Sequence, residues 1–383
     1  MRQATRFSPS RVWYGLDQTL LFTLAGLIVV GLTLSLAASP AAAERLRLSD
    51  PFYFVYRHIF FAFLSAAVLM VMAALSPRGV RRFAGLALVF SLLALIAVPF
   101  IGYEVNGAAR WLRLGGFSFQ PSELFKPAFI VIAAWLFSEE SKGAPVPGRL
   151  IAVGLYLVGV AFLITQPDFG QTLLLTVIFG AMLWAAGLSW LHTLTLGGLA
   201  SGGAVGAYFM LGHVRDRIAA FLAPSGGPGP TQTDMAINAI SRGGFTGVGP
   251  GGGEVKRYLP EAHTDFVFSV AAEEFGLIAS LAIIGLYAIL FARAWLNAVR
   301  LSDHFAQLAT AGLAMMFGGQ ALINILVNLE LAPAKGMTLP LISYGGSSML
   351  TLAFAAGLLL ALTKRKPGAY LPAGASGPAS VTP

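Results

Sequence analysis

Long hydrophobic runs separated by short polar segments dominate the chain. An α-helix needs about 20 apolar residues to cross a bilayer. Ten runs reach or approach that length, and they cover residues 19–38, 58–76, 83–102, 124–138, 149–165, 171–188, 192–211, 265–292, 305–329 and 347–363. The fourth and fifth runs are short and must extend into their flanks to span. We therefore predict an all-α, polytopic integral membrane protein with about ten transmembrane helices.

The first run is open to two interpretations. It follows Arg2, Arg6 and Arg11 and precedes the segment SPAAA, which resembles the cleavage site of a signal peptide. However, the apolar core of a signal peptide has only about 7–15 residues, whereas this run is long enough to span. The pattern favours an uncleaved first helix.

Composition supports the membrane class. Apolar residues make up 56% of the chain and charged residues only 11%, against about 25% charged residues in a soluble domain. The net charge of +8 comes from basic residues that flank the apolar runs, where they set orientation and meet anionic membrane lipid. We therefore predict no nucleic-acid partner. The absence of cysteine excludes disulfides, thiolate metal sites and thiol nucleophiles.

The distribution of basic residues predicts the orientation. Short cytoplasmic loops carry an excess of Lys and Arg. With a cytoplasmic N-terminus, the inner segments hold Arg2, Arg6, Arg11, Arg78, Arg81, Arg82, Lys142, Arg149, Arg293, Arg300, Lys364, Arg365 and Lys366. The short outer loops hold only Arg45, Arg47, Arg57, Arg110, Arg113 and Lys335. Both termini are thus predicted to be cytoplasmic.

This orientation divides the chain into three parts. Residues 1–17 form a cytoplasmic N-terminal segment, residues 18–366 form the membrane domain, and the low-complexity residues 367–383 form a disordered cytoplasmic tail. The one long loop, residues 213–264 between the seventh and eighth helices, then faces the outside. Nearly all motif-like sequence lies on this outer side.

The densest group of charges lies where the long loop enters the eighth run. Asp265 stands at the helix mouth, and Glu273 and Glu274 lie within the run. Ionisable groups at membrane depth are costly and suggest function. From the residues alone, however, Asp265 fits a helix N-cap equally well. Glu273 and Glu274 fit a structural role equally well, as buried pairing partners that orient the helix.

The loop itself contains three recognisable segments. Residues 213–224 have the pattern of an amphipathic interfacial helix, and residues 234–244 predict a short helix with Asp234 as N-cap. The segment GVGPGGGEVKR lacks the G-K-[ST] of a nucleotide-binding loop. It fits either a flexible hinge or a nest of backbone N–H groups that, with Lys256 and Arg257, holds a phosphate.

Other outer segments carry candidate residues. Pro121 opens a predicted helix on which Glu123 and Lys126, three residues apart, form either a structural ion pair or part of a site. Asp168 lies in a tight turn, where a cap is the more common role. Lys335 faces outward against the charge rule, which suggests that it holds an anion.

Several segments together resemble the SEDS family of bacterial shape, elongation, division and sporulation proteins. These segments are NGAARWL, FQPSELFK, QPDFGQT, RDRIAAFLAP, VKRYLPEAHTDFVFSVAAEEFG and KGMTLPLISYGGSS, and the resemblance covers residues 20–366. The last segment is closer to the division members than to the elongation members. The chain departs from the family pattern in the long loop, at TQTDMAINAISRGG and at the displaced run GGGE.

The resemblance implies a function and a site. Family members are ten-span enzymes that polymerise glycan strands from lipid II, with undecaprenyl pyrophosphate leaving in an inverting transfer. Their essential aspartate falls on Asp265, the expected general base, and no general acid is needed because pyrophosphate is a good leaving group. Glu123 and Lys126 are expected to support the site. The candidate phosphate contacts are Arg110, Arg215, Arg217, Lys256, Arg257 and Lys335. A divalent cation, Mg²⁺ or Mn²⁺, is a further candidate for neutralising the pyrophosphate.

The resemblance also implies partners and a location. The expected partners are lipid II, a class B penicillin-binding protein and regulators of the division machinery, in the bacterial cytoplasmic membrane with the active site facing the periplasm. Two alternatives stay open. One is a lipid II flippase that uses Lys126, Glu273 and Glu274 as a polar path, and the other is a non-catalytic scaffold of the division machinery.

Overall fold

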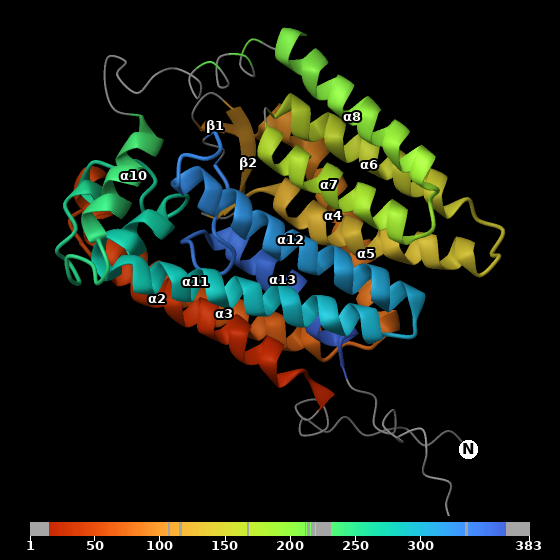
Figure 1. Cartoon of the computed structure of the whole chain (residues 1–383), viewed down its shortest axis with the longest axis horizontal. Helices are drawn as coiled ribbons and strands as arrows, with labels where there is room; N and C mark the ends of the chain where they lie inside the picture. Colours follow the sequence, from red (N-terminus) through yellow and green to blue (C-terminus); the bar gives the residue numbers. More distant parts are fainter. Residues whose placement is uncertain are drawn as a thin grey trace, which may run out of the picture.

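The computed structural model describes residues 15–105, 108–114, 117–166, 168–210, 231–333 and 336–364, together with residues 212, 215 and 219. Ten long helices lie in these ranges, one for each predicted run (Figure 1). They are α2 (Gln18–Arg45), α3 (Tyr53–Ala73), α4 (Pro77–Ile101), α5 (Pro121–Ser141), α6 (Gly148–Thr165), α7 (Phe169–Ala185), α8 (Trp190–Met210), α11 (Val267–Arg300), α12 (His304–Asn328) and α13 (Gly346–Leu362).

Helix starts follow local capping signals rather than the edges of the apolar runs. α4 begins six residues before its predicted run, because Ser76 accepts a hydrogen bond from Gly79 N at 3.2 Å and Pro77 occupies the first turn. Asp303 likewise caps α12 by accepting from Ala306 N at 3.3 Å. Polar flanks are therefore included in the helices.

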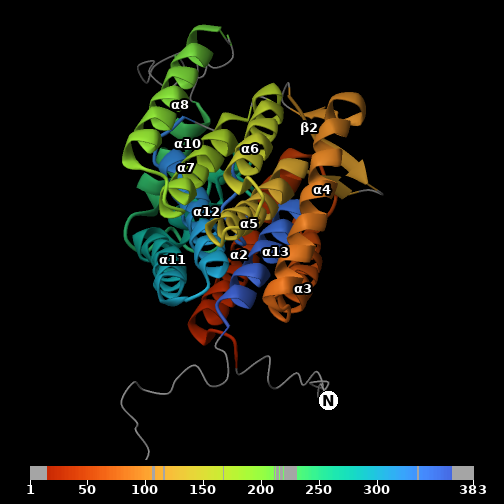
Figure 2. The same ribbon diagram turned by 90° about the vertical axis from the view of Figure 1, so that its right-hand side faces the viewer.

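The helices form one bundle whose centre is apolar. α13 is buried along almost its whole length and packs against α3, α12 and α5 (Figure 2). α11 packs against α12 and α2, α5 packs against α4 and α6, and α8 lies at the periphery against α7. The outer helices expose large apolar side chains, as expected for lipid-facing surfaces.

Six of the described helices, α2, α3, α4, α6, α11 and α12, are long and apolar enough to cross a membrane. α7 and α13 are shorter apolar helices. The chain is thus a multi-pass membrane protein by length and composition of its helices, while a total of ten spans stays a prediction.

The mostly helical fold includes one small sheet on the outer side. Between α4 and α5, the described residues of 103–119 form a three-stranded antiparallel sheet of β1 (Tyr103–Val105), β2 (Ala108–Leu114) and β3 (Phe117–Phe119). Leu112 lies opposite Phe119 and packs against Val98 of α4. The sheet forms because its apolar face covers the end of α4. Side chains alternate between the two faces along a strand, and a search for long helical runs does not detect this pattern.

The long loop contains two short elements before α11. α10 (Gln232–Gly243) matches the predicted helix, but Asp234 is not its N-cap. Thr231 caps the helix by accepting from Asp234 N at 3.1 Å, and Asp234 accepts from Thr231 N at 2.8 Å. This is a capping box, so Asp234 occupies the third helical position. The 3₁₀-helix η1 (Val255–Arg257) follows. Most of the predicted amphipathic helix at 213–224, and the N-terminal segment before residue 15 and the tail at 367–383, lie outside the described residues.

Candidate active site

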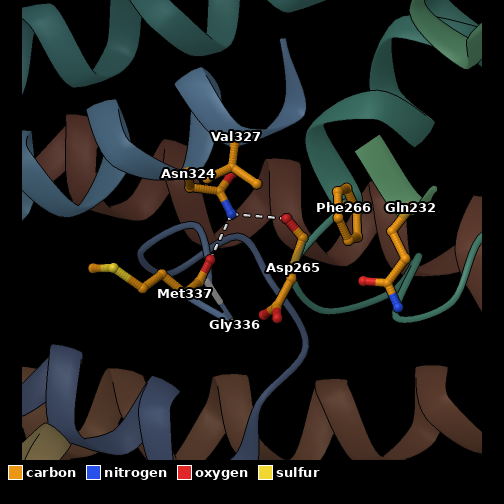
Figure 3. Close-up of a pocket in the computed structure, with 7 residues that line it drawn as sticks. All are labelled: Gln232, Asp265, Phe266, Asn324, Val327, Gly336 and Met337. Carbon is orange, nitrogen blue, oxygen red and sulfur yellow. Dashed lines mark hydrogen bonds between the residues drawn. The ribbon is translucent and has the colours of Figure 1, made fainter. Parts of the chain in front are cut away.

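Asp265 lies in the turn that leads into α11, and its backbone is fixed by two amides of α12. Asn324 Nδ2 donates to its carbonyl oxygen at 2.8 Å (Figure 3). Asn328 Nδ2 donates to the same oxygen at 3.1 Å. The residue at the N-cap position of α11 is Phe266, and no side chain caps that helix. The alternative that Asp265 serves as an N-cap is therefore not what the structure has.

The carboxylate of Asp265 points away from these amides, into a small pocket (Figure 3). The other lining residues are Gln232, Phe266, Asn324, Val327, Gly336 and Met337. These come from α10, the start of α11, α12 and the segment before α13. The pocket thus lies where the long loop meets the ends of several helices.

The electrostatic setting of Asp265 suits a base. The pKa of its carboxyl is raised to about 7, chiefly by burial and next by the nearby carboxylates of Glu261, Asp168 and Glu123, against the opposing charge of Arg110. No described residue donates a hydrogen bond to the carboxylate. A base with a pKa near neutral accepts a proton most effectively at physiological pH.

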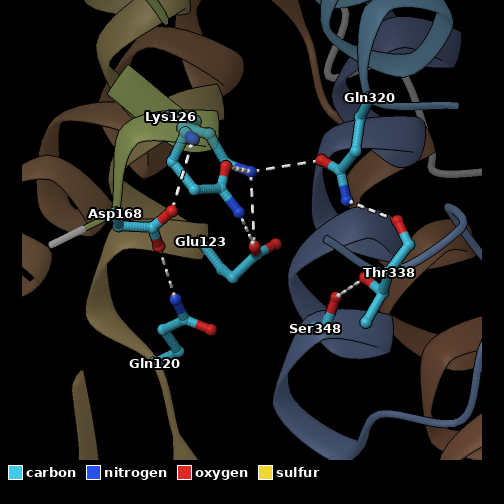
Figure 4. A network of polar contacts seen from close by, with 8 residues as sticks. Gln120, Glu123, Lys126, Asp168, Gln320, Thr338 and Ser348 are labelled. Carbon is cyan, nitrogen blue, oxygen red and sulfur yellow. Dashed lines mark hydrogen bonds and ion pairs between the residues drawn. The ribbon is translucent and has the colours of Figure 1, made fainter. Parts of the chain in front are cut away.

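Glu123 and Lys126 do form the predicted pair, and it is buried. Lys126 Nζ lies 3.3 Å from Glu123 Oε1, and the two side chains are 1% and 4% exposed. Gln171 donates to Glu123 Oε1 at 2.6 Å and accepts from Lys126, while Gln320 Oε1 accepts from Lys126 at 3.1 Å (Figure 4). Glu123 Oε2 has no hydrogen-bond partner among the described residues.

Gln320 links this network to the pocket. Its Nε2 donates to the carbonyl of Thr338 at 3.1 Å, one residue beyond Met337 in the pocket lining. Thr338 in turn shares a 3.0 Å hydrogen bond with Ser348 at the start of α13 (Figure 4). The Glu123–Lys126 pair and the backbone of Asp265 are therefore connected through one loop segment, by way of Gln320 and Asn324.

Asp168 has the cap role predicted for it. It accepts from Gln171 N at 3.3 Å at the start of α7, and Gln120 Nε2 donates to its other oxygen at 3.3 Å. Burial raises the pKa of this carboxyl, and Arg110 is the main opposing charge. Arg110 itself donates from Nε to the carbonyl of Gln166 at 2.7 Å. Arg110 thus lowers the pKa of both Asp168 and Asp265 through its charge.

The remaining predicted phosphate contacts have different surroundings. Lys256 is 5% exposed, and its ammonium pairs with Glu274 and donates to the carbonyl of Ala37 at 2.8 Å. These contacts give no support to a phosphate role for it. Arg257 and Arg215 are exposed, whereas Arg217 and Lys335 lie outside the described residues.

The glycine-rich segment is engaged by the protein's own carboxylates. Gly251 N donates to Glu274 at 3.0 Å, and the N–H groups of Glu254 and Val255 donate to Glu273 at 2.8 Å each. These N–H groups are satisfied within the chain, so neither the open phosphate nest nor the free hinge describes them. Glu273 and Glu274 orient the loop on α11, which agrees with the structural alternative left open for them.

Four polar residues of the site were not predicted. Gln171, Gln320, Asn324 and Asn328 lie inside the apolar runs of α7 and α12 and are buried. An amide within a membrane run is a signal that charge-based reasoning passes over, because buried amides also need partners. Only the fold shows that these side chains converge on Asp265 and Lys126.

Comparison with known proteins places this geometry in a family. Residues 18–367 match the FtsW/RodA/SpoVE family model, described as a cell cycle protein. The chain belongs to the FtsW/RodA/SpoVE family. It is 48% identical to the probable peptidoglycan glycosyltransferase FtsW of Caulobacter vibrioides (strain NA1000 / CB15N), over 95% of this chain and 93% of that protein. It is 37% identical to the protein of the same name from Halorhodospira halophila, over 91% of each chain.

Solved structures of the FtsW/RodA/SpoVE family type share the fold. One belongs to a peptidoglycan synthase complex described as coordinating polymerization and crosslinking, with a TM-score of 0.77, 30% identity and coverage of 92% of this chain and 98% of that chain. The rod shape determining protein RodA of Thermus thermophilus matches with a TM-score of 0.66 and 29% identity, over 92% of this chain and 97% of that one. The predicted family is thereby confirmed.

Proposed function

We propose that the protein is a peptidoglycan glycosyltransferase of the division type, which polymerises glycan strands from lipid II. The names of its relatives support this activity, and both relatives cited above carry the FtsW name. In the proposed reaction, the 4-hydroxyl of one lipid II attacks the anomeric carbon of another. Undecaprenyl pyrophosphate leaves and the configuration at the anomeric carbon inverts.

The observation that carries the proposal is the free carboxylate of Asp265. It projects into a pocket, accepts no hydrogen bond from a described residue, and has a pKa of about 7. It removes the proton of the acceptor hydroxyl as that oxygen attacks. Pyrophosphate departs as a stable anion, so the single carboxylate suffices, in contrast to glycosidases, which pair two.

Cationic groups assist the departure of pyrophosphate in this proposal. Arg110, which acts electrostatically on Asp265, is the best-placed described candidate, with Arg215 and Arg257 on exposed segments. Arg217 and Lys335 stay candidates from the sequence. The described residues contain no cluster of three or more His, Cys, Asp or Glu side chains that could hold a metal. A divalent cation would be held mainly by the pyrophosphate oxygens of the substrate, because Mg²⁺ commonly binds substrate phosphates and keeps few protein ligands.

The proposed location is the bacterial cytoplasmic membrane, with both termini cytoplasmic and the pocket facing the periplasm. The long loop contributes Gln232 to the pocket and ends directly before Asp265, so the pocket lies on the side where the basic-residue bias predicts the outer face. We further propose a class B penicillin-binding protein and division regulators as partners. The structural match to a complex that coordinates polymerization with crosslinking supports a crosslinking partner.

The flippase alternative has less support from the contacts. Glu273 and Glu274 bind the backbone of the outer loop, and Lys126 is enclosed by Glu123 and two glutamines. A transport path needs polar groups that face a water-filled route, whereas these groups are bound by the loop backbone or by neighbouring side chains.

The decisive experiment compares strand synthesis by wild type and Asp265→Asn, purified with the penicillin-binding partner and supplied with lipid II. We expect the variant to lose about 10²–10⁴-fold in rate, the contribution of a positioned base. Glu254→Gln, which alters an exposed carboxylate of the long loop that pairs with Arg242, is the matched control and should keep most of the activity. Equal rates for wild type and a folded Asp265→Asn would refute the role of Asp265, and strands from neither would return the flippase and scaffold to first place.

A further inference from the structure

The path of α11 is broken close to its outer end. Gly276 has φ 73°, a conformation that glycine adopts readily and other residues avoid, so a short first segment precedes the break. The outer loop takes up the backbone groups freed there. Val248 N donates to the carbonyl of Glu273 at 3.0 Å, and Leu277 N donates to the carbonyl of Gly244 at 2.9 Å. A Cβ at position 276 would lie 2.4 Å from loop backbone atoms.

The side chain of Glu273, three residues before Gly276, binds the same loop. Its carboxylate accepts from the backbone N–H groups of Glu254 and Val255 at 2.8 Å and of Lys256 at 3.2 Å. Glu273 is 0% exposed. Three donors on one buried carboxylate make a strong, directional anchor. We call residues 244–257, together with Glu273 and Glu274, the loop clamp.

The loop clamp reaches a third element through the neighbouring carboxylate. Glu274 pairs with the ammonium of Lys256 and accepts from Gly251 N at 3.0 Å. The same ammonium donates to the carbonyl of Ala37 in α2 at 2.8 Å. The clamp therefore ties the short outer segment of α11 to the loop and to α2.

Two walls of the pocket depend on these contacts. The segment of α11 that carries Glu273 begins directly after Asp265 and Phe266, which line the pocket. The clamped loop continues without interruption from α10, whose Gln232 also lines the pocket (Figure 3). A movement of the loop away from α11 would therefore shift Gln232 relative to Asp265.

We propose that Glu273 is a positioning residue for glycan-strand synthesis, which fixes the pocket by holding the loop backbone against the segment of α11 that follows Asp265. This inference rests on the proposed function. Glu273 is not a second base, because both of its oxygens are occupied by backbone donors and it does not line the pocket.

The test compares Glu273→Gln with Glu254→Gln. The amide of the first variant turns an N–H₂ group toward at least one backbone N–H, so the anchor is lost with little change in volume. Small displacements of reacting groups cost about 10²-fold in rate, and we expect a loss of this order in the turnover rate. Glu254 lies on the same loop, but its carboxylate is exposed and pairs with Arg242 on the surface, so its variant should stay within about twofold of wild type.

Two further readouts separate positioning from simple loss of folding. The residual activity of Glu273→Gln should show a lower pH midpoint than wild type, because a released loop admits water to Asp265 and relieves the burial that raises its pKa. The chain contains no cysteine, so a single thiol at Leu259, a loop residue that is 1% exposed, reports on the loop. Leu259→Cys should react faster with a maleimide when combined with Glu273→Gln than when combined with Glu254→Gln.

Slower synthesis, a lowered pH midpoint and faster thiol labelling together would support the proposal. It would be overturned if Glu273→Gln polymerised like the control, or if the thiol became reactive without any change in rate or pH profile. Should wild type itself make no strands, the proposed function fails, and the labelling rate alone then decides whether Glu273 holds the loop.

Discussion

Asp265 in the turn before α11 and Glu273 in the first segment of α11 are two carboxylates eight residues apart, and their surroundings are opposite. Glu273 is fully buried and receives three backbone N–H groups. Asp265 borders a pocket, and its carboxylate receives none from the described residues, although its carbonyl is held by two amides. Position in an apolar run made both residues candidates; their hydrogen-bond partners separate them.

The difference indicates how this protein uses costly charges. A carboxylate whose oxygens are saturated with donors is stabilised in one place and loses nucleophilic and basic character. A carboxylate that is held by its backbone but left unpaired stays available for a proton. The Glu123–Lys126 pair lies between these two cases. One oxygen of Glu123 accepts a hydrogen bond from Lys126, and the other has no hydrogen-bond partner among the described residues.

The largest effect on stability is expected from breaking the Glu123–Lys126 ion pair. Lys126→Met removes the ammonium and leaves the carboxylate of Glu123 buried without its counter-charge, which costs about 3–5 kcal/mol in unfolding free energy. Thermal unfolding in detergent measures the loss. The double variant Lys126→Met/Glu123→Gln should recover most of it, since no unpaired charge remains. A single variant as stable as wild type would show that Glu123 is not ionised opposite Lys126.

A smaller effect is expected from loosening the backbone of Asp265. Asn328→Ala removes the hydrogen bond to the Asp265 carbonyl and the acceptor for Ser269, whose hydroxyl lies 2.7 Å from Asn328 Oδ1. Buried groups left without a partner cost about 1–3 kcal/mol, and we expect the rate of strand synthesis to fall about tenfold. Thr310→Val, which alters another buried polar side chain of α12 that has no partner among the described residues, is the control. Equal rates for the two variants would contradict a positioning role for Asn328.

Protonation of Asp265 also tests the contrast between the two carboxylates. The base is active when ionised, so the rate should rise with pH and level off above the pKa of Asp265, about 7. One unit below the midpoint the rate should be about tenfold lower than the plateau. A pH–rate profile measures this, and a midpoint near 4 would contradict a raised pKa for the buried carboxyl of Asp265.

The same raised pKa has a consequence of opposite sign for stability. The folded state holds the proton of Asp265 more tightly than the unfolded state, so its contribution to stability is complete at low pH and is lost as the pH rises through about 7. Asp265→Asn should therefore be more stable than wild type at pH 8, while it is inactive. Unfolding curves at pH 6 and pH 8 test this difference.

Much of the fold was predictable because a membrane helix is specified locally. Every predicted apolar run contains one long helix, since in lipid each backbone group must be paired within its own segment. The predictions differ from the structure where backbone groups pair between separate strands or where a capping side chain sets the start of a helix. The sheet at residues 103–119 forms by pairing between strands, and Thr231 rather than Asp234 begins α10. The pairing of Glu123 with Lys126 was also predictable, because residues three apart on a helix are neighbours.

The membrane class, the helices, the family and the choice of Asp265 as a candidate base follow from the linear chain, because run length, charge and motif spacing are its own properties. Which charged groups have hydrogen-bond partners depends on tertiary contacts. Asn324 and Asn328 come from α12, about 60 residues beyond Asp265, and Lys256 is bound through Glu274 and α2. Hydrogen bonds between distant segments decide whether a buried carboxylate anchors a loop or accepts a proton, and no local pattern encodes them.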